Sequence, residues 1–198
     1  MTVKTKAESI FKEFCDFNNI FWEKIPEGEQ PTPDYRVVLN GQTVLIEVKQ
    51  IDKDDNFSNE SGSRTVGSHV RKKIEQARKQ AQAASNANTP FVLLLFNNLD
   101  ELQMFGTEQH DFVDAMYGER TLVFDKSKNA ITDSFQGRNR SLGDDKNTSF
   151  SAVGYLKKTQ KGIEVQIYAN IFAKNKLDFS IIPDCIEATR IEVDKSTA

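Results

Sequence analysis

Residues 33–49 read PDYRVVLNGQTVLIEVK and carry the clearest structural signal in the chain. Two runs rich in β-branched side chains, 35–39 and 42–50, flank the pair Asn40-Gly41. An Asn-Gly pair between two such runs is the strongest short-range signal for a β-hairpin with a two-residue turn. We therefore expect the two runs to pair as antiparallel strands.

The register of this hairpin places two acids opposite each other. With a two-residue turn at positions 40 and 41, cross-strand partners have residue numbers that sum to 81, so Asp34 faces Glu47. Directly opposed side chains lie about 4.5–5.5 Å apart at Cβ, and like charges there are destabilising. A divalent cation is the natural compensation. Strand alternation places Lys49 on the same face as Glu47. The opposite, apolar face carries Val44, Ile46 and Val48.

The segments around the hairpin indicate an α/β domain. Apolar residues recur at helical spacing within residues 5–18, which predicts an amphipathic helix, and residues 20–25 suit a short strand after it. Residues 91–96 form a continuous apolar run, typical of a strand buried on both faces of a parallel sheet. Between them a helix is expected over residues 69–86, with an apolar stripe made of Val70, Ile74, Ala77, Ala81 and Ala84. The order α, β, β, β, α, β predicts a mixed central sheet flanked by helices.

The second half of the chain gives weaker signals. Strands are expected at 121–124, 151–156 and 163–171, and the glycine-containing stretch 133–147 is expected to be a loop. A length of 198 residues suits one sizeable hydrophobic core. We therefore expect a single domain over residues 1–198, with a core at 5–125 and a β-rich extension at 126–198.

Composition narrows the possible partners. The formal net charge is -3, so binding to nucleic acid must come from a local basic patch. Cys15 and Cys185 have no ligand spacing around them, which disfavours a disulfide framework or a zinc site and suits a cytoplasmic protein. The longest apolar run, 91–96, is too short to span a bilayer, and the N-terminus has no apolar signal core. We expect no membrane partner.

The motif in the hairpin resembles that of a known nuclease superfamily. Pro33-Asp34, the hairpin and Glu47-Val48-Lys49 are similar to the PD-(D/E)xK nucleases in spacing, order and strand placement, and the preceding helix and following βαβ unit fit them too. The resemblance covers roughly the first half of the chain, and residues 168–173, YANIFA, resemble bacterial relatives. It implies a restriction endonuclease-like fold with an αβββαβ core. The implied function is a divalent-metal-dependent DNA endonuclease of restriction, defence or repair type.

The resemblance also implies a metal site made of hard oxygen ligands. Asp34 and Glu47 would bind Mg²⁺ or Mn²⁺, with the Val48 carbonyl as a possible further ligand. A glutamate early in the preceding helix would complete the site. Glu8 holds the similar position in this sequence, and Glu13 is the alternative.

Two further side chains are implied in catalysis. Lys49 would stabilise the charged phosphate or help deprotonate the attacking water, and its alternative role is a salt bridge to Glu47. Some relatives also place a glutamine on the helix after the motif. Gln80 is the better candidate for that position and Gln76 the weaker one.

The helix expected at 69–86 follows the motif directly and is strongly basic. Such a helix can contact phosphates that flank the scissile one, although a charge run is more often a solvated face. The candidate contacts are Arg71, Lys72, Lys73, Arg78 and Lys79. His110-Asp111 has no nucleophile or ligand spacing nearby and is interpreted as ordinary surface.

Partner and alternative functions remain open at this point. DNA is the expected substrate, while an RNA substrate fits the same motif. Cutting both strands of a duplex often uses a two-fold dimer, so a homodimer is a further expectation. The alternative function is a non-catalytic DNA-binding or assembly module that retains the nuclease fold.

Overall fold

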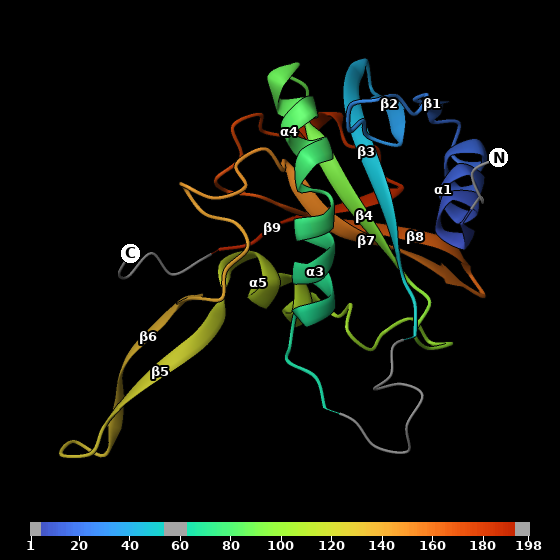
Figure 1. Ribbon diagram of the computed structural model, residues 1–198. Coiled ribbons are helices and arrows are strands. Elements are labelled where there is room, and N and C mark those ends of the chain that lie inside the picture. The colour runs from blue at the N-terminus through green and yellow to red at the C-terminus, as the bar shows by residue number, and fades with distance from the viewer. Residues whose placement is uncertain (1–4, 54–62, 193–198) are drawn as a thin grey trace.

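A seven-stranded mixed sheet organises the chain in the computed structural model, which describes residues 5–53 and 63–192 (Figure 1). The strand order is β1-β2-β3-β4-β7-β8-β9. The pairs β3–β4, β4–β7 and β8–β9 are parallel, and the remaining pairs are antiparallel. The strands are β1 (Phe21–Lys24), β2 (Tyr35–Leu39), β3 (Gln42–Ile51), β4 (Phe91–Asn97), β7 (Ala152–Thr159), β8 (Gly162–Ala169) and β9 (Ile186–Arg190). The predicted α/β class with a mixed central sheet is confirmed.

The β2–β3 hairpin has the predicted register. Val37 pairs with Val44, and Leu39 pairs with Gln42. Asn40 and Gly41 have positive φ angles of 43° and 91°, which a two-residue turn of type I′ requires. Because a slip by one residue would turn every side chain of a strand to its other face, this turn decides which face Glu47 occupies.

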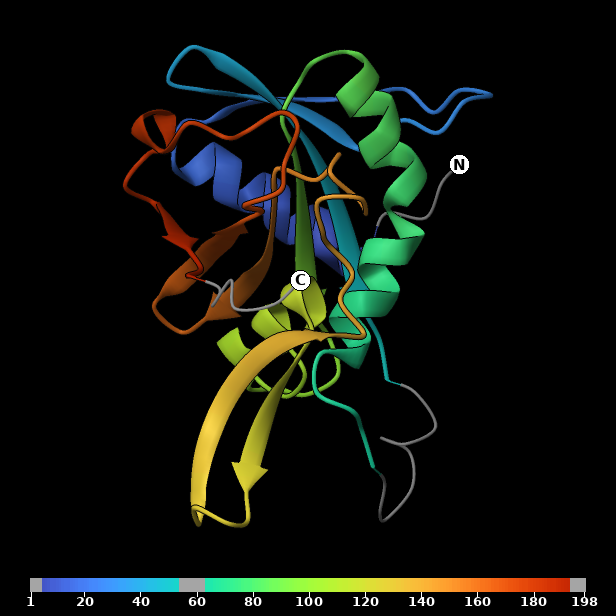
Figure 2. The same ribbon diagram turned by 90° about the vertical axis from the view of Figure 1, so that its left-hand side faces the viewer.

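Helices cover both faces of the sheet (Figures 1 and 2). Helix α1 (Lys6–Phe17) packs on one face, where Phe11 and Phe14 meet Val44, Ile46 and Val48. The opposite face is covered by α3 (Ser68–Gln76), α4 (Arg78–Asn86) and α5 (Gln109–Tyr117). Strand β4 supplies side chains to both layers, and all seven of its residues are buried, including the run 91–96 for which this was predicted. Among the described residues, each helix is too short or too polar to cross a membrane.

The single helix expected over residues 69–86 is two helices. Helices α3 and α4 meet at Ala77, whose φ and ψ of -90° and 2° interrupt the regular helical geometry. The predicted stripe is nevertheless buried on both sides of this break, from Val70 and Ile74 in α3 to Ala81 and Ala84 in α4. The apolar spacing continues through the break, so periodicity alone could not reveal it.

The three strands expected in the second half of the chain are present, but other elements there were not predicted. Strands β5 (Glu119–Asp125) and β6 (Ala130–Arg138) form a separate hairpin that projects from the body of the protein (Figures 1 and 2). Strand β6 includes the start of the stretch expected as a loop. The division expected between residues 125 and 126 falls in the turn of this hairpin, and β7, β8 and β9 lie in the same large sheet as β1 to β4. Helix α5, strand β9 and the short 3₁₀ helix η1 (Phe179–Ile181) were not predicted.

Gly154 on β7 lies tightly against β8, because a Cβ added there would lie 2.0 Å from the Gln166 carbonyl oxygen. We expect Gly154→Ala to push the two strands apart and lower the free energy of unfolding by about 1–3 kcal/mol, as measured by urea denaturation. Gly28→Ala is the matched control, since the space around a Cβ there is open. Equal stability of the two variants would contradict the close approach.

Candidate active site

Three carboxylates and two lysines gather where the β2–β3 pairing ends, beside the N-terminus of α1. Glu8 comes from α1, Lys24 ends β1, Asp34 precedes β2, and Glu47 and Lys49 lie on β3. We call these five residues the carboxylate cluster. It contains four of the residues implied by the sequence motif and one, Lys24, that the sequence did not indicate.

Asp34 and Glu47 each bind the main chain of the opposite strand. The Asp34 backbone N–H donates to Glu47 Oε2 at 3.1 Å, and the Val48 backbone N–H donates to Asp34 Oδ2 at 3.0 Å. The predicted juxtaposition of the two acids is therefore present. Because the N–H and C=O of a strand residue point toward the same neighbouring strand, the Val48 carbonyl also lies on the side of Asp34.

Glu47 is the most buried member of the cluster, with 2% of its side chain exposed. Burial raises the pKa of Glu47 to about 7; nearby Asp34 adds to this, and Lys49 opposes it. The Lys49 ammonium lies 2.5 Å from Glu47 Oε1. The salt bridge that was the alternative role for Lys49 is thus formed, while its role at a phosphate stays a prediction.

Glu8 uses its two oxygens for different purposes. Oε2 accepts from the Thr5 backbone N–H at 3.0 Å and closes the capping box at the start of α1, whereas Oε1 accepts from Lys24 Nζ at 2.6 Å. Burial would raise the pKa of Glu8, but hydrogen bonds from Lys24 and Thr5 outweigh it and lower the pKa to about 2. Glu13 instead pairs with Lys158 at 2.7 Å on the surface. Glu8, not Glu13, is the helix glutamate of the cluster.

Lys24 bridges two of the carboxylates. Its ammonium lies 2.6 Å from Glu8 Oε1 and 3.1 Å from Asp34 Oδ1. Burial alone would lower the pKa of Lys24, but Glu8 and Asp34 outweigh this and raise it. The sequence could not place Lys24, because nothing in the long connection between β1 and β2 allows their register to be counted. In the structure Lys24 pairs with Tyr35 across these strands.

The donor atoms of the cluster suit a hard divalent cation. Three carboxylates and a main-chain carbonyl are oxygen ligands of the kind that Mg²⁺ and Mn²⁺ prefer. Two ammonium groups lie among them, so these lysines provide the compensation that the opposed acids require. The described group whose ligand atoms all lie within 4.8 Å of one another is a different one, made of Glu108, His110 and Asp111. Glu8, Asp34 and Glu47 would have to converge to hold one ion.

The Glu108-His110-Asp111 group has a structural role. Asp111 is fully buried, which corrects its interpretation as ordinary surface. Its carboxylate accepts from the backbone N–H groups of Gly67 at 2.8 Å and Glu108 at 3.2 Å and forms an ion pair with Arg64. With both oxygens engaged, Asp111 anchors the segment that leads into α3 against α5.

The basic residues of α3 and α4 differ in their availability. Arg71 donates to the Asp114 carbonyl at 3.0 Å and to the Val66 carbonyl, so its guanidinium is engaged within the fold. Arg78 lies 3.7 Å from Glu75 in an exposed ion pair. Lys72 and Lys79 are exposed.

Lys73 and Gln80 are half-buried, unlike Lys72, Lys79 and Gln76, which are exposed. Burial lowers the pKa of Lys73, Asp52 opposes this, and the charges of Lys49 and Lys72 add to it. The charge of Lys73 therefore interacts with that of Lys49, a member of the cluster. Gln80 Oε1 is buried and has no hydrogen-bond partner in the described part of the chain. A buried acceptor without a partner lowers stability, so Gln80 Oε1 is available to a donor from outside the chain. Gln80 therefore remains a better site candidate than the exposed Gln76.

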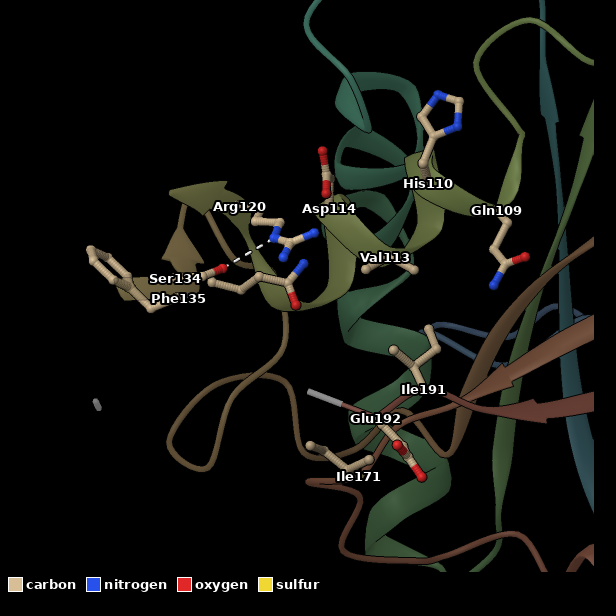
Figure 3. A pocket seen from close by; sticks show the side chains of 11 residues that line it. Gln109, His110, Val113, Asp114, Arg120, Ser134, Phe135, Ile171, Ile191 and Glu192 are labelled. Carbon is tan, nitrogen blue, oxygen red and sulfur yellow. Dashed lines mark hydrogen bonds between the residues drawn. The ribbon is translucent and has the colours of Figure 1, made fainter. Parts of the chain in front are cut away.

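A groove of about 1150 Å³ is formed by α5, the β5–β6 hairpin and residues near the C-terminus (Figure 3). Its lining includes the positively charged Arg120 and the acids Asp114 and Glu192. Arg120 Nε donates to Ser134 Oγ at 3.1 Å across the hairpin. The groove shares no residue with the carboxylate cluster. The volume of a groove is therefore no guide to the candidate active site in this protein.

Comparisons with protein-family models, with curated proteins and with solved structures found no match to this chain. The resemblance to the PD-(D/E)xK nucleases therefore stays an expectation from the motif. The contacts of the carboxylate cluster show independently of the motif that Asp34, Glu47 and Lys49 lie together.

The raised pKa of Glu47 predicts how stability depends on pH when metal is chelated. A carboxyl that binds its proton more tightly in the folded state loses stability as pH rises between the unfolded and folded pKa values. We expect wild type in EDTA to lose on the order of 3 kcal/mol between about pH 4.5 and pH 7 from this group. Glu47→Gln should lack that component, as measured by urea unfolding at several pH values. Parallel pH profiles for the two proteins would rule out the raised pKa.

Proposed function

We propose that the protein is a divalent-metal-dependent nuclease that hydrolyses phosphodiester bonds in DNA. The observation that supports this most is the contact set at the hairpin. Asp34 and Glu47 face each other across β2 and β3, and the ammonium of Lys49 lies against the Glu47 carboxylate. This combination of two acids and a lysine supplies ligands for a cation and a charge for a phosphate.

The order of elements is compatible with a restriction endonuclease-like fold. A helix, three antiparallel strands, two consecutive helices and a parallel strand follow one another from α1 to β4. The cluster lies at the end of the β2–β3 pairing, which is where the motif predicts it. The large sheet then continues through β7, β8 and β9, beyond the part that the resemblance covers.

Bound Mg²⁺ or Mn²⁺ would act as a Lewis acid on the phosphate and lower the pKa of a water molecule. Asp34, Glu47 and the Val48 carbonyl would hold the ion, and Glu8 would complete the site. Glu47 must be ionised to bind a cation, so its pKa of about 7 makes metal binding stronger as pH rises through neutrality. Lys49 would stabilise the charge that develops on the phosphate.

Lysines near the cluster would position the nucleic acid. Leu45 and Ile51 of β3 pack in the layer formed with α3 and α4, and strand alternation places Lys49 on that same face. Lys72, Lys73 and Lys79 follow on these two helices. Together they would provide a local basic surface on a chain whose net charge is -3, as a site for phosphates requires.

One observation favours a second candidate function. Lys24 and Lys49 already neutralise carboxylates of the cluster, and such an ion-pair network can be purely structural. The protein would then be a DNA-binding or assembly module without catalysis. If it does cut both strands of a duplex, a two-fold dimer would place one cluster at each strand.

Cleavage assays separate these functions. Supercoiled plasmid, linear duplex, single-stranded DNA and RNA are incubated with the full chain in Mg²⁺, Mn²⁺ or EDTA. We expect metal-dependent cleavage of DNA that falls by about 100-fold or more in Glu47→Gln and in Lys49→Ala, because each variant removes a group from the metal site or from the developing charge.

Glu13→Gln is the matched control, since this glutamate lies on the same helix as Glu8 but pairs with Lys158 away from the cluster. It should cleave at the wild-type rate. Folded Glu47→Gln or Lys49→Ala protein that also cleaves at the wild-type rate would refute the assigned roles. Metal-dependent DNA binding without cleavage of any substrate would favour the second function.

The basic surface predicts a salt dependence of binding. Replacing Lys72 and Lys79 together by glutamine should weaken DNA binding and reduce the slope of log affinity against log salt by up to about 0.9 for each lost phosphate contact. Fluorescence anisotropy in Ca²⁺ or EDTA measures this without cleavage. Lys126 and Lys161, exposed lysines in the turns of the β5–β6 and β7–β8 hairpins, provide the matched double substitution. If both pairs have the same effect, α3 and α4 form an ordinary solvated face.

A further inference from the structure

Lys24 holds a position between two proposed metal ligands. Its ammonium lies 2.6 Å from Glu8 Oε1 and 3.1 Å from Asp34 Oδ1, and both carboxylates are largely shielded from solvent. These two contacts join α1 to the segment that enters β2. Within the described residues, the ion pairs of Glu8 and of Asp34 are both made with Lys24.

The surroundings fix this ammonium in place. Lys24 pairs with Tyr35 across β1 and β2, and its Nζ lies 4.7 Å from the centre of the Tyr35 ring, a cation–π distance. The hydroxyl of the same tyrosine donates to Glu8 Oε1 at 3.2 Å. Tyr35 itself is fully buried, between Phe11 and Trp22. The bridge is therefore part of a packed arrangement and not a chance contact of a surface side chain.

A divalent cation and this ammonium cannot occupy the bridge together. A Mg²⁺ ion bound to Glu8 and Asp34 would lie about 2.0–2.1 Å from their oxygens, in the space where Nζ now contacts the same two atoms. Like charges at such separations repel strongly, the more so where water is largely excluded. One of the two cations must leave.

We propose that Lys24 is an internal counter-cation of the nuclease site, and that a divalent metal ion binds by displacing its ammonium from Glu8 and Asp34. This inference rests on the proposed function for the identity of the metal ligands. The bridged form binds metal poorly, so the measured affinity is reduced in proportion to the fraction of molecules in which Lys24 has left the carboxylates. The displaced ammonium stays tethered beside the site on a flexible stem, where a substrate phosphate is the next available anion.

Metal affinity of the full chain tests the exchange. Mn²⁺ binding is measured by calorimetry for wild type, Lys24→Met and Lys6→Met. Lys6 is the matched control, because it is an exposed lysine of α1 near Glu8 whose Nζ contacts Asn98 Oδ1 at 3.3 Å. We expect Lys24→Met to bind Mn²⁺ about tenfold more tightly or better, while Lys6→Met stays near wild type. Unchanged or weaker binding by Lys24→Met, or an equal gain in both variants, would overturn the exchange.

A second measurement uses wild type and so does not depend on the folding of a variant. Limited acetylation with acetic anhydride is read at each lysine by mass spectrometry, with and without saturating Mn²⁺. Displacement should raise the acetylation of Lys24 relative to Lys158, whose partner Glu13 lies outside the cluster. Constant or reduced acetylation of Lys24 would contradict the proposal.

The two proposals can fail separately. Metal-dependent DNA cleavage with no change of affinity in Lys24→Met and no change of Lys24 acetylation would leave the nuclease assignment in place and refute the exchange. A gain of affinity in Lys24→Met together with no cleavage of any substrate would support the exchange and refute the nuclease assignment. Absence of Mn²⁺ binding in all three proteins would refute both.

Discussion

The positive φ angles of Asn40 and Gly41 are the constraint on which the site depends. They set a two-residue turn, and the turn sets the pairing of Val37 with Val44 along the hairpin. With any shift by one residue, Glu47 would point to the layer packed against α1, among Phe11 and Phe14, and its charge would have no partner there. The chemistry of the cluster thus begins with two backbone angles about six residues away along the strand.

Burial removes the Glu47 carboxylate from water, and other groups of the cluster replace the lost hydration. A carboxylate removed from water is costly unless hydrogen bonds and opposite charge replace the lost hydration. The Asp34 backbone N–H and the Lys49 ammonium do so here. Asp34, placed close by the register, then requires a partner of its own, which Lys24 supplies while also pairing with Glu8. Each contact follows from the one before it, starting from the strand register.

Local signals explain what the sequence revealed and what it did not. The hairpin, the buried β4 and the stripe from Val70 to Ala84 were predictable, because turn chemistry and apolar periodicity act between near neighbours. The register of β1 against β2 was not, since their connection has no defined turn, and Lys24 was missed for that reason. The break at Ala77 involves neither glycine nor proline. The burial of Asp111 depends on Arg64 and Gly67, which are distant in sequence, and the projecting β5–β6 hairpin lacks the alternation that signals a sheet with one covered face.

The charges of the cluster indicate an order of binding on the proposed function. Three carboxylates carry -3 and two lysines carry +2, which leaves -1 when Glu47 is ionised and zero when it is protonated. A cluster with a net charge of -1 or zero does not attract a negatively charged phosphodiester. Contact with the metal-free cluster would therefore contribute little to the free energy of DNA binding. A divalent cation changes the sum from -1 to +1, and one phosphate group then returns it to zero. Metal binding should therefore precede productive substrate binding, and both should release the lysines from the carboxylates that now hold them. The carboxylates and lysines that pair with each other in the folded cluster would then supply the metal ligands and the positive charges for the reaction.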